Sequence, residues 1–257
     1  VSDKTTDQLE KLSSGRRINS AGDDAAGLAI GTKLDAETRS LRQAARNGND
    51  GISFVQTAEG GLNEISSILI RLRELGVQAG SDTVGEQERE FLDLEYQQLL
   101  TEVDRISNST QFNGKFLLNG EESEDLDFHV GAFKGDHNKI TFQASATNST
   151  TSGLGVDGSS ISSKSDALDS LETVDAAIME LSSQRATLGS IQKRLQHSVS
   201  SISTQVINQD AAKSRIMDAD IAESASQLAS ANIIKQAGIS ALAQANSLPY
   251  ATTKLIG

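Results

Sequence analysis

Proline is nearly absent from this chain of 257 residues, in which Pro249 is the only example. Because proline breaks α-helices and central β-strands, its absence elsewhere permits helices of unusual length. Apolar residues follow one another at alternating spacings of three and four, without exception over six positions: Val55, Ala58, Leu62, Ile65, Leu69 and Leu72. This spacing predicts a continuous apolar face along a long helix.

The long helix is predicted to cover residues 25–78 and to end at the turn residues 80–82. Ser20, followed by Asp23, resembles a capping box at its start. The apolar face is weaker upstream, where the same frame includes Glu37, Gly48 and Gly51. A second helix over 85–106 has one apolar face, made of Leu92, Tyr96, Leu99, Val103 and Ile106. The link between these helices is short, so they are expected to be antiparallel.

The periodicity changes between residues 111 and 143. Apolar and polar residues alternate over 126–130 and 139–143, which predicts two half-buried strands joined by a loop over 131–138. Five of the seven Phe residues lie here, so this is the expected sheet-containing part: Phe112, Phe116, Phe128, Phe133 and Phe142. Residues 144–165 are rich in Ser, Thr and Gly and are expected to form an exposed connection.

A third long helix is predicted to begin near Ser165 and to follow a heptad repeat. Its a positions include Leu171, Ile178, Val199 and Val206, and its d positions are Val174, Leu181, Leu188, Leu195 and Ile202. The frame also places Arg185, Gln192 and Gln209 at core positions, where polar residues weaken a seam but fix its register.

The last helical segment, 221–246, contains only one acidic and one basic residue, Glu223 and Lys235. A helix with so few charges is a poor solvent-facing surface, so a partner is expected to cover it. The surface that this partner would contact is predicted to comprise Leu228, Ile233, Ile234, Ile239, Leu242, Gln244 and Asn246.

The composition argues against several classes of function. A net charge of −12 disfavours binding to nucleic acid or to an anionic membrane. There is no Cys, and none of the three His residues has a metal-binding spacing; His137 beside Asp136 fits a solvated turn better than a metal site. The glycines at 153, 155 and 158 match a dinucleotide fingerprint without the flanking strand and helix that it requires. No catalytic, cofactor or metal site is predicted, and the chain is not expected to be an enzyme.

Two segments resemble the signature regions of bacterial flagellin. The first is LSSGRRINSAGDDAAGLAI at 12–30, which continues through matching motifs within 46–60. The second is SALAQAN at 240–246, followed by Pro249, and SRIMDAD at 214–220 matches as well. The resemblance covers nearly the whole chain outside about 121–165. By this resemblance, the chain lacks the large variable outer domains of longer family members.

The resemblance implies a filament subunit that is mainly α with a small β-hairpin region, in which long antiparallel helices form coiled-coil bundles and the two terminal segments pair. Residues 1–15 and 221–257 are expected to form the inner terminal-helix domain, and 16–220 the outer helical bundle, including a hairpin region over 107–165. Family members begin several turns upstream of Val1, so the inner N-terminal helix is expected to be incomplete here.

The resemblance also implies secretion and an extracellular place in the bacterial flagellum. The expected partners are further copies of the chain in a helical filament, an export chaperone, the filament cap and the hook-associated junction proteins. A Toll-like innate immune receptor is a further expected partner, with Arg71, Leu75 and Glu95 at the positions of the family's receptor-contacting motif. The alternative for these three residues is a packed Leu75 and a local Arg71–Glu95 ion pair, which contributes little when exposed.

Three alternatives to a plain filament subunit remain open on the sequence. A hook–filament junction protein has the same terminal design, although the uninterrupted signature segments favour flagellin. An enzyme inserted in the variable region is disfavoured because about forty residues are too few for a catalytic fold. The Ser and Thr residues between 145 and 165 permit O-linked glycans but do not predict them.

Overall fold

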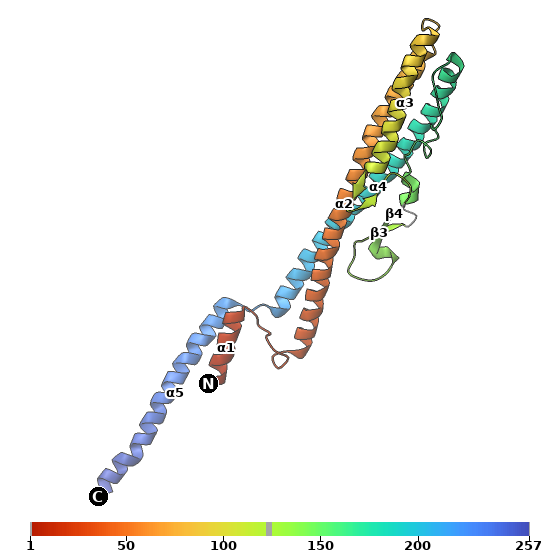
Figure 1. Ribbon diagram of the computed structural model, residues 1–257. Helices are drawn as coiled ribbons and strands as arrows, with labels where there is room; N and C mark the ends of the chain where they lie inside the picture. Colours follow the sequence, from red (N-terminus) through yellow and green to blue (C-terminus); the bar gives the residue numbers. More distant parts are fainter. Residues whose placement is uncertain (1, 122–124, 257) are drawn as a thin grey trace. The chain divides into compact units, whose positions relative to one another are not determined.

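The computed structural model describes residues 2–121 and 125–256, with side chains at all of these except 2, 145 and 247–256. Five helices account for most of it: α1 (Ser2–Ser14), α2 (Ala25–Ala79), α3 (Glu86–Ser109), α4 (Lys164–Met217) and α5 (Ile221–Ile256). Two small hairpins lie between α3 and α4, made of β1 (Gln111–Phe112) with β2 (Lys115–Phe116) and β3 (Leu126–His129) with β4 (Lys139–Phe142). The predicted mainly α fold with a small hairpin region is confirmed (Figure 1).

The chain divides into two compact units. One consists of residues up to 39 together with those from 205 onward, and the other of residues 40–204. The long helices α2 and α4 each contribute residues to both units. The expected inner and outer filament domains have other boundaries than these two units. They concern positions in an assembled filament, so that division stays a prediction.

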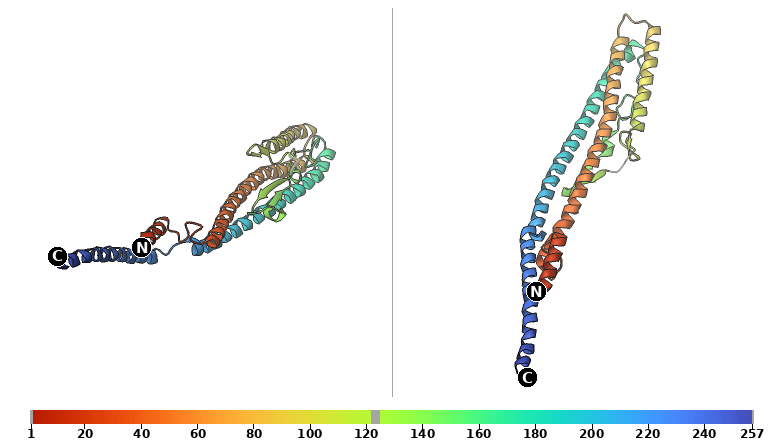
Figure 2. Two further views of the ribbon diagram at one scale, coloured as in Figure 1. Left: turned by 90° about the horizontal axis from the view of Figure 1, so that it is seen from below. Right: turned by 90° about the vertical axis from the view of Figure 1, so that its left-hand side faces the viewer.

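Within residues 40–204, α2, α3 and α4 lie side by side (Figure 2). We call the predicted apolar face of α2 from Val55 to Leu72 the seam. All six of its residues are fully buried. Arg89 on α3 donates to the carbonyl oxygens of Ala79 at 2.7 Å and Ser81 at 2.9 Å, which fixes the turn between the helices. The predicted antiparallel arrangement of α2 and α3 is confirmed.

Glycines in the weak part of the seam mark close approaches to α2. A Cβ at Gly48 would lie 2.6 Å from Cγ2 of Val199 on α4. A Cβ at Gly51 would lie 3.0 Å from the ring of Phe128 on β3. The seam therefore continues upstream of Val55. There the side chains of α4 and β3 fill the space beside the glycines, whereas downstream the apolar side chains of α2 fill it themselves.

The buried face of α4 differs from the predicted heptad core. The d positions Val174, Leu181, Leu188, Leu195 and Ile202 are all buried, as predicted. The a positions Leu171, Ile178, Val199 and Val206 are only half-buried. Four residues on the other side of the d row are buried instead: Ser170, Ala177, Gln184 and Ile191. Gln184 is hydrogen-bonded to Ser149 and Asn148, so the segment after β4 also packs on this side of α4.

The hairpin of β3 and β4 is built as the alternation predicted. Leu126 pairs with Phe142 and Phe128 with Ile140 in an antiparallel register. Phe54 of α2 makes edge-to-face contacts with three aromatic rings, at centroid distances of 5.8 Å to Phe112, 5.5 Å to Phe128 and 5.1 Å to Phe142. The predicted sheet-containing part is confirmed, and two of its five Phe side chains, Phe116 and Phe133, are exposed.

The prediction of an exposed connection over 144–165 is wrong. Seven of its described side chains are buried: Ala144, Thr147, Ser149, Thr151, Leu154, Val156 and Ile161. Asp104 of α3 accepts a hydrogen bond from the backbone N–H of Thr151 at 2.8 Å, and Asp93 accepts one from Ile161 at 2.8 Å. We call residues 144–163 the strap. It packs because carboxylates of α3 satisfy its backbone and its scattered apolar residues join the bundle.

The start of α2 also differs from the prediction. Asp24, rather than Ser20, caps the helix, since its Oδ1 accepts a hydrogen bond from the N–H of Gly27 at 2.9 Å. Asp23 instead accepts hydrogen bonds from the N–H groups of Asn19 at 3.0 Å and Ser20 at 2.8 Å, which closes a turn before the helix. These two hydrogen bonds lower the pKa of Asp23.

Candidate self-association surface

The two segments that lead away from the terminal helices are hydrogen-bonded to each other. The N–H of Ala219 donates to the carbonyl of Gly15 at 3.0 Å, and the N–H of Arg17 donates to the carbonyl of Met217 at 2.7 Å. Gly15 follows α1 in the left-handed region, with φ of 69°, a conformation that glycine adopts without steric cost. This pairing holds the end of α1 beside the start of α5.

The start of α5 is capped within the same region. Oδ1 of Asp220 accepts hydrogen bonds from the N–H groups of Ala222 at 2.9 Å and Glu223 at 3.1 Å. An acidic N-cap satisfies helix N–H groups that have no partner inside the helix and interacts favourably with the helix dipole. The segment 218–220 therefore ends α4 and begins α5 without a long loop.

The pairing of the terminal segments leaves most of α5 uncovered. Ser224 and Ala231 on α5 are buried, as is Thr5 on α1, and Leu228 is half-buried. After Ala231, every described side chain as far as Asn246 is exposed. The predicted pairing of the N- and C-terminal segments is confirmed, and it covers only the first turns of α5.

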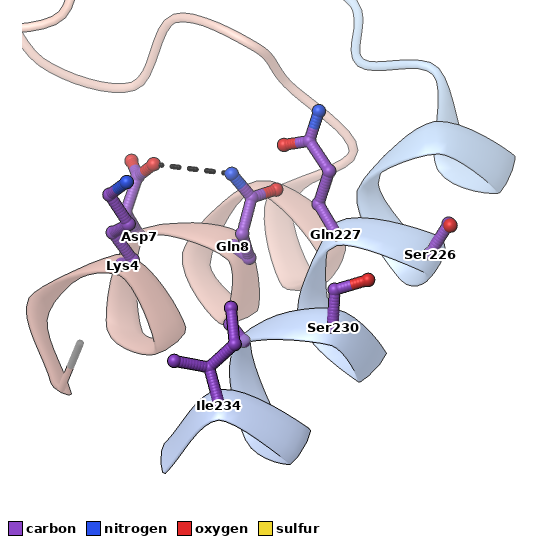
Figure 3. A pocket seen from close by; sticks show the side chains of 8 residues that line it. Lys4, Asp7, Gln8, Ser226, Gln227, Ser230 and Ile234 are labelled. Carbon is purple, nitrogen blue, oxygen red and sulfur yellow. Dashed lines mark hydrogen bonds between the residues drawn. The ribbon is translucent and has the colours of Figure 1, made fainter. Parts of the chain in front are cut away.

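A groove of about 690 Å³ runs where α1 meets α5. Its polar lining includes Lys4 and Gln8 from α1 and Ser226 and Ser230 from α5, and Ile234 lies at its lower end in Figure 3. Asp7 accepts hydrogen bonds from Lys11 at 2.8 Å and from Gln8 at 3.5 Å. No pattern in the sequence indicates this groove, because its polar lining residues on both helices look like ordinary solvent-facing positions.

The uncovered part of α5 exposes four large apolar side chains. Their exposed fractions are 70% for Ile233, 58% for Ile234, 60% for Ile239 and 65% for Leu242. Burying such a side chain contributes about 1.5–3 kcal/mol, so leaving four of them in water is unfavourable for an isolated chain. Gln244 and Asn246, also predicted to face another subunit, are exposed on the same segment.

The three predicted receptor-contacting residues lie together on α2 and α3 but differ in exposure. The Arg71 guanidinium donates to Oε1 of Glu95 from Nε at 3.0 Å and from Nη2 at 2.8 Å, and its Nη1 donates to Glu74 at 3.1 Å. The hydrogen bonds that Arg71 donates to Glu95, and then the one to Glu74, raise the pKa of Arg71. Arg71 and Glu95 are each about half exposed, whereas Leu75 is fully buried in the bundle.

Neither a metal-binding cluster nor a membrane-spanning helix is found among the described residues. Residues 2–121 and 125–256 contain no group of three His, Cys, Asp or Glu side chains that suits a metal ion. In the same ranges, no helix combines the length and hydropathy needed to cross a bilayer.

Comparison with known families gives two matches that together cover most of the chain. Residues 2–123 match the bacterial flagellin N-terminal helical region, and residues 171–256 match the bacterial flagellin C-terminal helical region. The chain is 41% identical over 248 residues to a flagellin of Halalkalibacterium halodurans, covering 96% of this chain and 90% of that protein. It is 40% identical over 281 residues to a flagellin of Bacillus subtilis, covering 96% and 91% respectively.

Solved structures give the same assignment. The crystal structure of Bacillus cereus flagellin matches with a TM-score of 0.54 and 29% identity, over 65% of this chain and 94% of that one. A putative flagellar hook-associated protein from Vibrio parahaemolyticus matches with a TM-score of 0.63 over 76% of this chain and 100% of that one. Its 14% identity shows a shared fold alone.

Proposed function

The chain belongs to the bacterial flagellin family, and on that premise we propose that it is a structural subunit that polymerises with copies of itself into the flagellar filament for motility. The observation that supports this most directly is the uncovered segment of α5, where four large apolar side chains face water. A filament lattice supplies each copy with identical neighbours, which would cover this segment in every subunit at once.

In this proposal, the terminal helices form the inner wall of the filament and pair there as coiled coils. Ordering a long exposed helix costs conformational entropy, and burial of its apolar side chains against neighbouring copies offsets that cost. The unit of residues 40–204 has its own buried core and forms the surrounding shell. Assembly would therefore change the surroundings of α5 far more than those of the bundle.

The family also suggests partners that act before and at assembly. An export chaperone would cover α5 until secretion, and the filament cap and hook-associated junction proteins would contact the same terminal segments outside the cell. The exposed apolar side chains of α5 support such a chaperone, because an uncovered apolar helix promotes aggregation in a crowded compartment. The absence of Cys from the chain is compatible with export before folding.

A hook–filament junction protein is the less favoured alternative. The likeness to the Vibrio parahaemolyticus protein concerns the fold alone, whereas the relatives at 40% and 41% identity are named flagellins. A junction protein adds only at an existing end, and a flagellin also extends filaments of its own kind.

Recognition by a Toll-like receptor is a second proposed role. It is supported by the exposed Arg71–Glu95 pair, which places a cation and an anion on neighbouring helices. Leu75 is buried, so its part would be to hold α2 in place beneath the pair. Replacing Arg71 by Ala should reduce receptor activation with the bundle still folded. The matched control is Arg73→Ala, which removes a similarly exposed guanidinium that pairs with Asp175; equal activity of both variants and the parent chain would refute the role.

Negative-stain electron microscopy of the purified chain, with and without filament seeds, tests the proposed function. We expect long thin filaments that grow from the seeds. Soluble protein under all conditions would favour the junction alternative. So would protein that binds at the ends of the seeds without lengthening them.

A further inference from the structure

A second hollow of about 470 Å³ lies between the β3–β4 hairpin and α4, within residues 40–204. Its lining includes His137 and Lys139 from the hairpin and Arg194 and His197 from α4. An ammonium, a guanidinium and two imidazole groups, from two separate segments, thus line the same hollow. This concentration is unusual in a chain whose net charge is −12.

The groups in this hollow differ in how far their charge is already compensated. Lys139 pairs with Asp127 at 2.9 Å and with Asp136 at 3.4 Å. Arg194, His137 and His197 have no hydrogen bond or ion pair with any described side chain. Asp136 is the one carboxylate of the lining, and its side chain is 92% exposed, so it can turn away from an incoming anion.

The floor of the hollow favours a bound charge. Val130 and Ile140 are both buried and contribute apolar surface next to the basic groups. Electrostatic attraction is stronger beside a low-dielectric wall than in bulk water. Ser198 adds a hydroxyl donor to the lining. A guanidinium with free N–H groups forms paired hydrogen bonds with two oxygens of one oxyanion.

We infer that this hollow is an oxyanion-binding site, which holds a sulfate- or phosphate-like ion or the carboxylate of an acidic side chain from a second copy of the chain. Arg194 supplies the main charge, and the ring N–H groups of the two imidazoles add hydrogen-bond donors. The other ionisable groups around the site are Asp127, Asp136 and Lys139, with His129 opposite Lys139 on the neighbouring strand.

The chain has only three His residues, so imidazole NMR signals provide a direct test. Sodium sulfate is titrated into the full chain at constant pH, with sodium chloride at matched ionic strength as the control. We expect saturable shifts at His137 and His197 and smaller shifts at His129.

Variants separate a specific site from general screening. Arg194→Gln should weaken sulfate binding about tenfold, since a hydrogen bond to a charged group is lost. Lys193→Gln removes the neighbouring positive charge, whose side chain contacts Gln196, and should leave the affinity unchanged. Equal, non-saturating shifts at all three His residues, or an unchanged affinity of the Arg194→Gln protein, would overturn the proposal.

A dilution series without sulfate distinguishes the two sources of the oxyanion. If a carboxylate of a second copy occupies the hollow, the signals of His137 and His197 change with protein concentration and sulfate reverses the change. If the site takes a free ion, these signals are independent of concentration and respond only to sulfate.

Discussion

The hydroxyl of Ser149 in the strap donates a hydrogen bond of 2.6 Å to Oε1 of Gln184 on α4, and both residues are buried. The amide of Gln184 in turn donates to the carbonyl of Asn148 at 3.1 Å. A Ser-rich segment that composition assigns to solvent is thereby bound to the buried face of α4. The strap is part of the packed structure, and its polar groups are satisfied individually.

Replacing Gln184 by Ala should destabilise the bundle by about 1–3 kcal/mol, because the hydroxyl of Ser149 and the carbonyl of Asn148 lose a buried partner. Urea unfolding followed by circular dichroism measures this difference. The control is Thr187→Ala on the same helix, where the exposed hydroxyl contacts only a carbonyl of its own helix and little change is expected. Equal stability of both variants would contradict a packed strap.

Two glycines of α2 should respond in opposite ways to replacement by Ala. Gly60→Ala should stabilise the chain by about 0.5–1 kcal/mol, because nothing lies within 4 Å of the added methyl group and alanine favours the helix. Gly51→Ala should destabilise it despite the same gain in propensity, because the methyl group would press on the Phe128 ring at 3.0 Å. Thermal unfolding of both variants checks the signs, and a stabilised Gly51→Ala protein would show that the hairpin is not held against α2.

Acid should weaken the unit that contains the chain ends. The hydrogen bond from Lys213, at 2.9 Å, lowers the pKa of Asp35 in the folded chain. A carboxyl group with a lowered pKa stabilises the fold at pH values above its unfolded pKa of about 3.9, and this stabilisation is lost as the pH falls through the folded pKa. The melting temperature of Asp35→Asn should be below that of the parent at pH 7, and the difference should shrink as the pH is lowered from 5 to 3. A difference that stays constant over this range would argue against this ion pair.

Added salt should favour polymerisation. Each copy has a net charge of −12, so neighbouring copies repel one another, and salt screens this repulsion at separations beyond about 10 Å at 0.1 M. Light scattering of seeded solutions at 20 mM and 200 mM sodium chloride measures the rate. Faster growth at the lower concentration would show that attractive ion pairs, rather than net repulsion, control assembly.

The helices and the β3–β4 hairpin could be predicted from the sequence because their apolar residues recur at regular spacings. The seam from Val55 to Leu72 and the d positions of α4 have the regular spacing that helix packing requires, and the alternation around Phe128 and Ile140 sets the strand register. The uncharged surface of α5 also pointed to the exposed apolar side chains that the structure contains. Flagellin signature segments identified the family from the same regions.

Features that depend on contacts between distant polar residues could not be read in this way. The strap is held by Asp93, Asp104 and Gln184, none of which differs in sequence from an ordinary solvent-facing residue of a helix. Leu75 occupies a position of the receptor-contacting motif, but it lies about one helical turn after Leu72, beside the seam, and is buried. The hollow beside Arg194 requires two segments about sixty residues apart to meet, which no local pattern records.

The most direct test of the central claim is the critical concentration for seeded assembly of a chain in which Ile233 and Ile239 are both replaced by Ser. Each replacement removes about 1.5–3 kcal/mol of the free energy gained when the side chain is buried in the filament. The critical concentration should therefore rise at least about tenfold above that of the parent. Met179→Ser on α4 removes an equally exposed apolar side chain outside α5 and should leave it nearly unchanged. If the double variant assembles at the parent's concentration, the uncovered face of α5 is not what joins the subunits.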